Sequence, residues 1–108
     1  MAERLVSGQK HTVAAVEWLP EAIADFHRLY EFLLDKDSNA AAHAASCILQ
    51  GITLLKSTPR IGRPRADGID SRELFVAFGA GAYVLRYVLE NDSTVIVIRV
   101  WHSRENRS

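Results

Sequence analysis

The sequence predicts an α+β domain in which an N-terminal strand is followed by an antiparallel helical hairpin and a three-stranded antiparallel meander, with the helices packed on one face of the sheet. Two patterns support this prediction, because apolar residues recur at helical spacings between Pro20 and Pro59 and β-rich runs replace them after Ser71. The composition agrees, since 108 residues with 48% hydrophobic and 24% charged side chains can build one core. We therefore treat residues 1–108 as a single domain.

The first two elements are expected to be a short strand and a helix. The run from Thr12 to Trp18 is rich in β-forming residues and ends before Pro20, which cannot donate to a strand ladder. Pro20 suits the first turn of a helix, and Glu21 and Asp25 lie near the positive end of its dipole. The apolar face of this helix is predicted from spacings of three and four residues to hold Ile23, Phe26, Tyr30, Leu33 and Leu34.

A second helix follows a polar break at residues 35–39, where Ser38 or Asn39 is the expected N-cap. Small residues early in this helix allow close approach to the first one, and Pro59 ends it. Residues 60–68 have the glycine and proline content of a loop. The predicted apolar stripe is Ala41, Ala44, Ala45, Ile48, Ile52 and Leu55.

The residues from Ser71 onward are predicted to form the three-stranded meander. Alternating residues from Ser71 to Phe78 predict a strand, and Gly79-Ala80-Gly81 predicts a turn. Two further β-rich runs, residues 83–89 and 94–101, are joined by the polar residues 90–93. The order of elements is therefore strand, helix, helix, strand, strand, strand.

Charge and cysteine content restrict the functional class. Thirteen basic and thirteen acidic residues give zero formal charge, which disfavours a protein held to nucleic acid by its overall charge. The single cysteine, Cys47, can form neither an intramolecular disulfide nor a cysteine zinc site, so we expect a reducing, cytoplasmic location. Neither a membrane-spanning run nor a signal peptide is recognisable, and we expect no membrane partner.

Familiar cofactor and metal motifs are missing from the sequence. It has no phosphate-binding loop, no His-Glu-x-x-His and no dinucleotide fingerprint, and its four histidines are widely spaced. Cys47 and Ser103 have no identifiable activating base, which disfavours nucleophilic catalysis. We therefore expect no cofactor and no metal.

Arginines supply the most distinctive candidate site. Arg60, Arg63, Arg65 and Arg72 form the densest basic cluster, able to grip phosphates or carboxylates. The alternative is a solvated loop partly neutralised by nearby aspartates. Arg86 and Arg99, within apolar strands, are each expected either on the open sheet face or buried with a partner.

His102 stands beside Arg104 at the end of the last predicted strand. The imidazole can act as a general acid or base, with Arg104 stabilising a phosphoryl transition state. The interpretation favoured by the sequence alone is that His102 only makes local hydrogen bonds.

Five segments together resemble the RelE/ParE toxin superfamily of type II toxin-antitoxin modules. They are Val-Glu-Trp-Leu-Pro-Glu-Ala at 16–22, Gly-Arg-Pro-Arg at 62–65, Ser-Arg-Glu-Leu at 71–74, Tyr-Val-Leu-Arg-Tyr at 83–87 and Ile-Arg-Val-Trp-His-Ser-Arg-Glu at 98–105. The resemblance implies the RelE/ParE-like fold over nearly the whole chain.

The resemblance implies two alternative mechanisms. RelE-like members cleave messenger RNA in the ribosomal A site without a metal, whereas ParE-like members poison DNA gyrase. The neutral charge, the similarity of residues 98–104 to a ParE-like strand end, and the absence of both a tyrosine after His102 and a lysine-rich surface favour the ParE branch. We therefore predict a non-hydrolytic gyrase inhibitor whose target-binding candidates are Arg60, Arg63, Arg65, His102 and Arg104.

Two alternatives remain. A RelE-like nuclease would use Arg65, Arg72, Arg86 and His102. An inactive member would instead act only with its antitoxin, as a DNA-binding repressor complex.

The superfamily also implies a cognate, ParD-like antitoxin whose C-terminal segment lays apolar side chains beside the helical hairpin. DNA would be contacted only through the antitoxin complex. The open sheet face would carry either residues 83, 85 and 87 or residues 84, 86 and 88. The antitoxin-binding candidates are Phe26, Tyr30, Leu33, Tyr83 and Tyr87.

Overall fold

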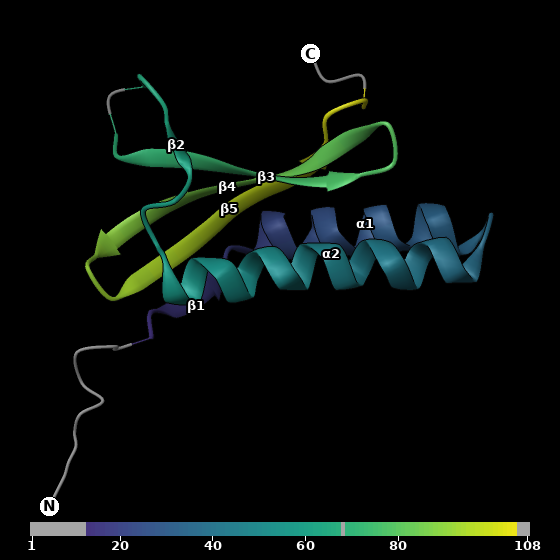
Figure 1. Cartoon of the computed structure of the whole chain (residues 1–108), viewed down its shortest axis with the longest axis horizontal. Helices are drawn as coiled ribbons and strands as arrows, with labels where there is room; N and C mark the ends of the chain where they lie inside the picture. The colour runs from purple at the N-terminus through teal and green to yellow at the C-terminus, as the bar shows by residue number, and fades with distance from the viewer. Residues whose placement is uncertain (1–12, 68, 106–108) are drawn as a thin grey trace, which may run out of the picture.

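Two helices pack against one face of a five-stranded mixed sheet (Figure 1). The computed structural model describes residues 13–67 and 69–105. The elements are β1 (Ala15–Trp18), α1 (Pro20–Leu34), α2 (Ser38–Ser57), β2 (Arg63–Pro64), β3 (Ser71–Phe78), β4 (Gly81–Asn91) and β5 (Thr94–His102). The sheet order is β1-β5-β4-β3-β2. The predicted α+β class, helical hairpin and antiparallel meander are therefore confirmed.

The sheet edges differ from the prediction. β1 pairs in parallel with β5, from Ala15 opposite Thr94 to Trp18 opposite Val97. It begins at Ala15, and Thr12 lies outside the described residues. The loop predicted over 60–68 contains β2, which pairs with β3 although it is only two residues long. This strand was predicted as loop because the segment is rich in glycine and proline. A two-residue edge strand can pair without β-forming residues.

The buried face of α1 is formed by different residues from those predicted. Ala22, Asp25 and Leu29 are its buried residues, whereas Ile23 and Leu34 are exposed. The apolar pattern was misassigned because α1 has apolar side chains on two faces, and only one of them meets the sheet.

Helix α2 begins after a different cap from the one predicted. The Asp37 carboxylate accepts hydrogen bonds from the backbone N–H groups of Asn39, at 2.9 Å, and Ala40, at 3.4 Å. Ser38 and Asn39 are therefore the first residues of the helix, and the prediction that one of them caps it was wrong. The buried residues of α2 are Ala41, Ala44, Cys47, Ile48, Gly51, Ile52 and Leu55.

Gly51 sets how closely α2 approaches the sheet. A Cβ atom built at this position would lie 2.8 Å from the Leu85 side chain and 2.9 Å from that of Val76. The absence of a side chain at Gly51 thus brings the helix backbone onto β3 and β4, which builds a tightly packed core.

The register decides which face of β4 the helices cover. Tyr83, Leu85 and Tyr87 belong to the core cluster, so they lie on the helix-covered face. Val84, Arg86 and Val88 alternate with them and lie on the opposite, open face. A bulge between Arg86 and Tyr87 shifts the β5 register, so that the buried core positions on β5 are Val95, Val97 and Val100. Among the described residues, no helix is both long and apolar enough to cross a membrane.

Candidate functional site

The predicted site residues are divided between the two faces of the sheet. Arg86 is opposite Glu73 on the open face, whereas Arg72 is opposite Tyr87 and His102 opposite Tyr83 on the helix-covered face. They are also divided lengthwise, because Arg72 and the loop before it lie at one end of the sheet and His102 at the other (Figure 1). The residues proposed for a nuclease therefore do not form one constellation.

Arg65 and Arg86 meet on the open face, where Glu73 bridges them. The Arg86 guanidinium donates to Glu73 at 2.7 and 2.9 Å, and Arg65 Nε lies 3.5 Å from the same carboxylate. Arg65 also pairs with Asp67. A hydrogen bond from the Ser71 hydroxyl is the main cause of the lowered pKa of Asp67, against the opposing effect of desolvation. These carboxylates neutralise both arginines.

Arg86 has a second contact through its face. Its guanidinium carbon lies 4.7 Å from the centre of the Trp101 ring, within the range of a cation–π interaction. Of the two sequence-based options for Arg86, the structure therefore selects the open face, with an ion pair and an aromatic neighbour.

Arg72 and Tyr87 hold the loop that precedes β2. The Arg72 guanidinium donates to the carbonyls of Arg60 and Gly62 at 2.9 and 3.0 Å. The Tyr87 hydroxyl donates to the Pro59 carbonyl at 2.7 Å and accepts from the Gly62 N–H at 2.9 Å. Burial raises the pKa of this hydroxyl. Tyr87 is fully buried, so its assignment to the antitoxin surface was wrong.

His102 uses both ring nitrogens within the fold. The N–H of Arg104 donates to Nδ1 at 3.2 Å, and Nε2 lies 3.0 Å from the Phe78 carbonyl. Since a backbone N–H can only donate, these partners assign Nδ1 as acceptor and Nε2 as donor. His102 therefore links the C-terminal turn to the end of β3 through local hydrogen bonds, in agreement with the interpretation favoured by the sequence.

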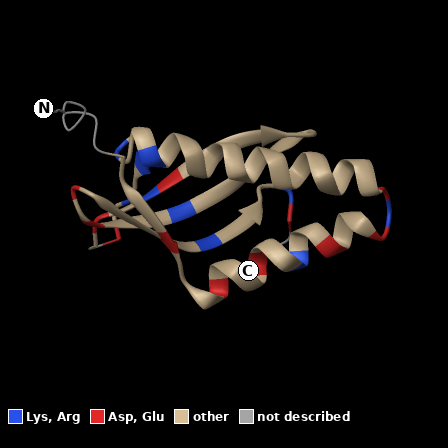
Figure 2. Cartoon of the chain, turned by 90° about the horizontal axis from the view of Figure 1, so that it is seen from below, with Lys and Arg blue, Asp and Glu red and all other residues tan. Residues whose placement is uncertain are grey.

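The remaining predicted arginines are exposed at the sheet margins. Arg60 pairs with Asp92 at 2.9 Å, and the Arg63 guanidinium lies 5.4 Å from the Phe75 ring centre. Arg104 is exposed and follows His102 at the opposite end of the sheet. Figure 2 shows Lys/Arg and Asp/Glu segments interspersed along the sheet and α1, and α2 almost without charge. The target-binding candidates thus form two separate groups.

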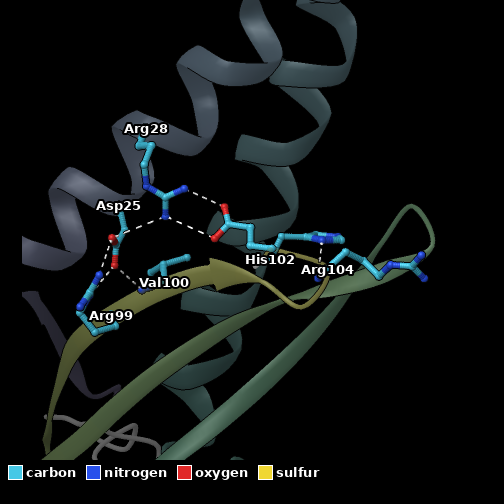
Figure 3. Close-up of polar contacts among 7 residues, drawn as sticks. Asp25, Arg28, Arg99, Val100, His102 and Arg104 are labelled. Atoms are coloured by element: carbon cyan, nitrogen blue, oxygen red, sulfur yellow. Dashed lines mark hydrogen bonds and ion pairs between the residues drawn. The ribbon is translucent and has the colours of Figure 1, made fainter. Parts of the chain in front are cut away.

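Sequence reasoning missed a buried carboxylate, Asp25, that joins α1 to β5 (Figure 3). It accepts from Arg99 at 2.8 and 3.1 Å and from the Val100 N–H at 2.9 Å. Arg28 lies 3.7 Å from Asp25 and donates to Glu105 at 2.7 Å. The available signal was the spacing of Asp25 from Ala22 and Leu29, which places it on the buried face of α1.

Two apolar depressions flank α1. The first, here called the hairpin groove, consists of three neighbouring hollows along α1 and α2, which share the lining residues Phe26, Tyr30 and Ala45. Phe26 and Tyr30, two of the predicted antitoxin contacts, lie in it. Its apolar lining is Trp18, Ile23, Phe26, Tyr30, Leu34, Ala42, Ala45 and Leu49.

The second depression, here called the sheet-end cavity, has a volume of about 360 Å³. It lies between the second half of α1, the end of the β3–β4 hairpin and the C-terminal turn. Leu33 and Tyr83, predicted as antitoxin contacts, here meet His102 and Arg104, predicted as target contacts. The full lining is Leu29, Phe32, Leu33, Phe78, Tyr83, His102, Arg104 and Glu105.

Comparison with known families identifies the fold. The model of the ParE toxin of type II toxin-antitoxin systems (parDE) matches residues 16–107. The chain belongs to this family. The matched residues include every described helix and strand except the first residue of β1. Membership of the family implies a cognate antitoxin as partner.

Two curated relatives and one solved structure agree with membership of the ParE toxin family. Toxin RelE1 of Caulobacter vibrioides is 39% identical over 83 residues, covering 77% of this chain and 86% of the relative. Toxin RelE3 of the same organism is 37% identical over 93 residues, covering 86% of this chain and 98% of the relative. A chain from the chromosomal ParDE system of P. aeruginosa superposes with a TM-score of 0.66 at 15% identity, covering 84% of this chain and 97% of that one, so it shows the shared fold.

Proposed function

We propose that this ParE-family toxin acts by binding its target rather than by hydrolysis, and that the target is DNA gyrase. The observation that carries the proposal is the division of the four candidate residues between two sheet faces, with Arg65 and Arg86 beside Glu73 on the open face and Arg72 and His102 on the other. Cleavage of a phosphodiester without a metal needs an acid, a base and cations around one phosphate. Side chains on opposite faces of a sheet cannot surround one phosphate.

The contacts of these residues also argue against hydrolysis. His102 would have to break a hydrogen bond to expose either ring nitrogen, and Glu73 holds Arg65 and Arg86. A zero formal charge also gives little of the phosphate-driven affinity that ribosomal RNA offers. Binding to a protein target requires none of these features.

The hairpin groove is the proposed docking surface for the cognate antitoxin. Ile23, Leu34 and Leu49 are exposed along it, and Lys56 is the only charged residue of α2. A row of neighbouring apolar hollows on a helix pair suits an amphipathic segment that lays its apolar side chains into them. Phe26 and Tyr30 are the central contacts in this arrangement.

A supercoiling assay with purified toxin and gyrase tests the target. We expect inhibition of supercoiling together with trapped cleaved DNA, and reversal of both when the antitoxin is added. Gyrase that supercoils normally in the presence of a toxin that arrests growth would overturn the gyrase proposal. Absence of growth arrest without the antitoxin would point instead to a repressor component.

Ribosome-dependent cleavage of messenger RNA is the second candidate function, since both curated relatives carry the name RelE. Arg65 and Arg86, which share Glu73, would then contact the message. This function requires that the purified toxin cleaves mRNA on added ribosomes, and that His102→Ala or Arg86→Ala abolishes the cleavage. Intact message in that assay, run beside the supercoiling assay, excludes it.

A further inference from the structure

The sheet-end cavity has an apolar interior that the described residues leave unfilled. Leu29 and Leu33 of α1 face Phe78 and Tyr83 of the β3–β4 hairpin across it. Its volume of about 360 Å³ is at the small end of the range of ligand pockets and can accept one large apolar side chain. Phe32, 60% exposed, extends the apolar surface at its rim.

The wall of the cavity includes a tyrosine, Tyr83. Tyr83 is only 2% exposed, and among the described residues its hydroxyl forms no hydrogen bond. Tyr87, two positions along the same strand, uses its hydroxyl both as donor and as acceptor. Among the described residues, Arg72 Nε and not this hydroxyl is the buried side-chain atom that lacks a hydrogen-bond partner, so the Tyr83 hydroxyl is not closed off from the cavity and can pair with a bound molecule.

Two cations that have no carboxylate partner among the described residues, Arg104 and Lys36, flank the cavity. Arg104 lines it and forms no ion pair with the residues that the structure describes. Lys36 lies 4.7 Å from the centre of the Phe32 ring, and it too forms no ion pair within residues 13–67 and 69–105. The acidic lining residue, Glu105, is bound by Arg28 at 2.7 Å (Figure 3). The rim therefore favours a ligand with negative charge.

We propose that the sheet-end cavity is a docking site for an acidic protein segment, which inserts one large apolar side chain and places carboxylates against Arg104 and Lys36. A backbone or side-chain polar group of the segment pairs with the Tyr83 hydroxyl. A buried apolar anchor surrounded by a polar rim is the usual arrangement at the centre of a protein interface. This site lies on a different flank of α1 from the hairpin groove and does not depend on gyrase being the target.

Three synthetic pentapeptides, acetylated and amidated, test the proposal. The first is Asp-Asp-Phe-Asp-Asp, the second replaces Phe by Ala, and the third replaces each Asp by Asn. Binding is followed by amide chemical shifts of the full-length toxin. We expect saturable shifts around the cavity for the first peptide, with affinity at least about tenfold weaker for the other two.

Variants of the toxin locate the binding site. We expect Tyr83→Phe and Arg104→Gln each to weaken the first peptide about three- to tenfold, and Leu33→Trp to abolish binding by filling the cavity. Tyr83→Phe keeps the ring and hence the packing. Matched controls are Arg60→Gln, at the opposite end of the sheet, and Leu49→Ala, in the hairpin groove; both should leave the affinity unchanged.

Three results would overturn the proposal: equal affinity for the Phe and Ala peptides, chemical shifts confined to the hairpin groove, or unchanged binding to the Leu33→Trp variant. The amide spectrum of each variant shows whether it is folded, so loss of binding is not confused with unfolding.

Discussion

At the residue scale, Asp25 takes the place of a strand on the side of β5 where β1 ends, beyond Val97. β1 pairs with β5 only as far as Val97, so the Val100 N–H at the same edge needs another acceptor. The Asp25 carboxylate supplies it and also binds Arg99. An acidic residue on the buried face of an amphipathic helix is thereby explained by a backbone requirement in a distant strand.

Replacement of Asp25 tests this role. We expect Asp25→Ala to lower the free energy of unfolding by about 2–4 kcal/mol, because it leaves the Val100 N–H and the Arg99 guanidinium without their acceptor. Urea denaturation followed by circular dichroism measures the loss. Glu105→Gln, which breaks an ion pair to the half-exposed Arg28, is the matched control and should cost less than about 1 kcal/mol. A similar loss in both variants would contradict the assigned role.

The pH dependence of stability gives a second test of Asp25. Burial favours its neutral form, but hydrogen bonds from Arg99 and Val100 and the nearby guanidinium charges outweigh this and lower its pKa below the ordinary value of 3.8. A carboxylate with a lowered folded-state pKa contributes stability that is present above the unfolded pKa and lost as the pH falls through the folded one.

We therefore expect the difference in urea midpoint between wild type and Asp25→Asn to be constant from about pH 7 to 5 and to shrink below about pH 4. Asp67, whose pKa is also lowered, titrates in both proteins and so cancels in the difference. A difference that grows on acidification would contradict the assignment.

At the element scale, α2 depends on a cap outside the two positions that the sequence suggested. We expect Asp37→Ala to destabilise the fold by about 1 kcal/mol, because its carboxylate satisfies two N–H groups of the first turn. Ser38→Ala and Asn39→Ala, at the positions first predicted as caps, should each change stability by less than about 0.5 kcal/mol. Thermal and urea unfolding of the three variants measure this, and a larger loss at residue 38 or 39 would contradict Asp37 as the cap.

The C-terminal turn depends on the lack of a side chain at Gly81. A Cβ atom there would collide with the Ser103 hydroxyl and come within 3.0 Å of the His102 ring and the Arg104 stem. We expect Gly81→Ala to displace this turn, to lower stability by about 1–3 kcal/mol and to shift the amide signals of residues 102–105. Gly79→Asn is the control, since the space there is open and asparagine tolerates its positive φ. An unchanged spectrum in Gly81→Ala would contradict the close contact.

At the scale of the whole molecule, periodicity predicted the fold well and the candidate site poorly. The positions of the helices and of the meander follow from the spacing of apolar residues along the chain, which can be read directly from the sequence. Which side chains share a face depends on the β-bulge after Arg86, and their availability depends on partners distant in sequence, such as Glu73 for Arg86. The same limit explains Tyr87, an aromatic residue that resembles a binding residue in sequence but is used to hold a loop.

The separation of the two depressions allows the antitoxin surface to be tested apart from toxicity. We expect Leu49→Glu, at a position 52% exposed in the hairpin groove, to retain the fold and to weaken antitoxin binding at least about tenfold, because it places a charge in the apolar groove. Growth should then stay arrested when the antitoxin is co-expressed, and affinity is measured by calorimetry. Ile69→Glu, at an apolar position that is 59% exposed and lies outside both depressions, should still be neutralised. Neutralisation of Leu49→Glu at wild-type affinity would move the antitoxin to another surface, and loss of toxicity in Leu49→Glu would mean that target and antitoxin share the groove.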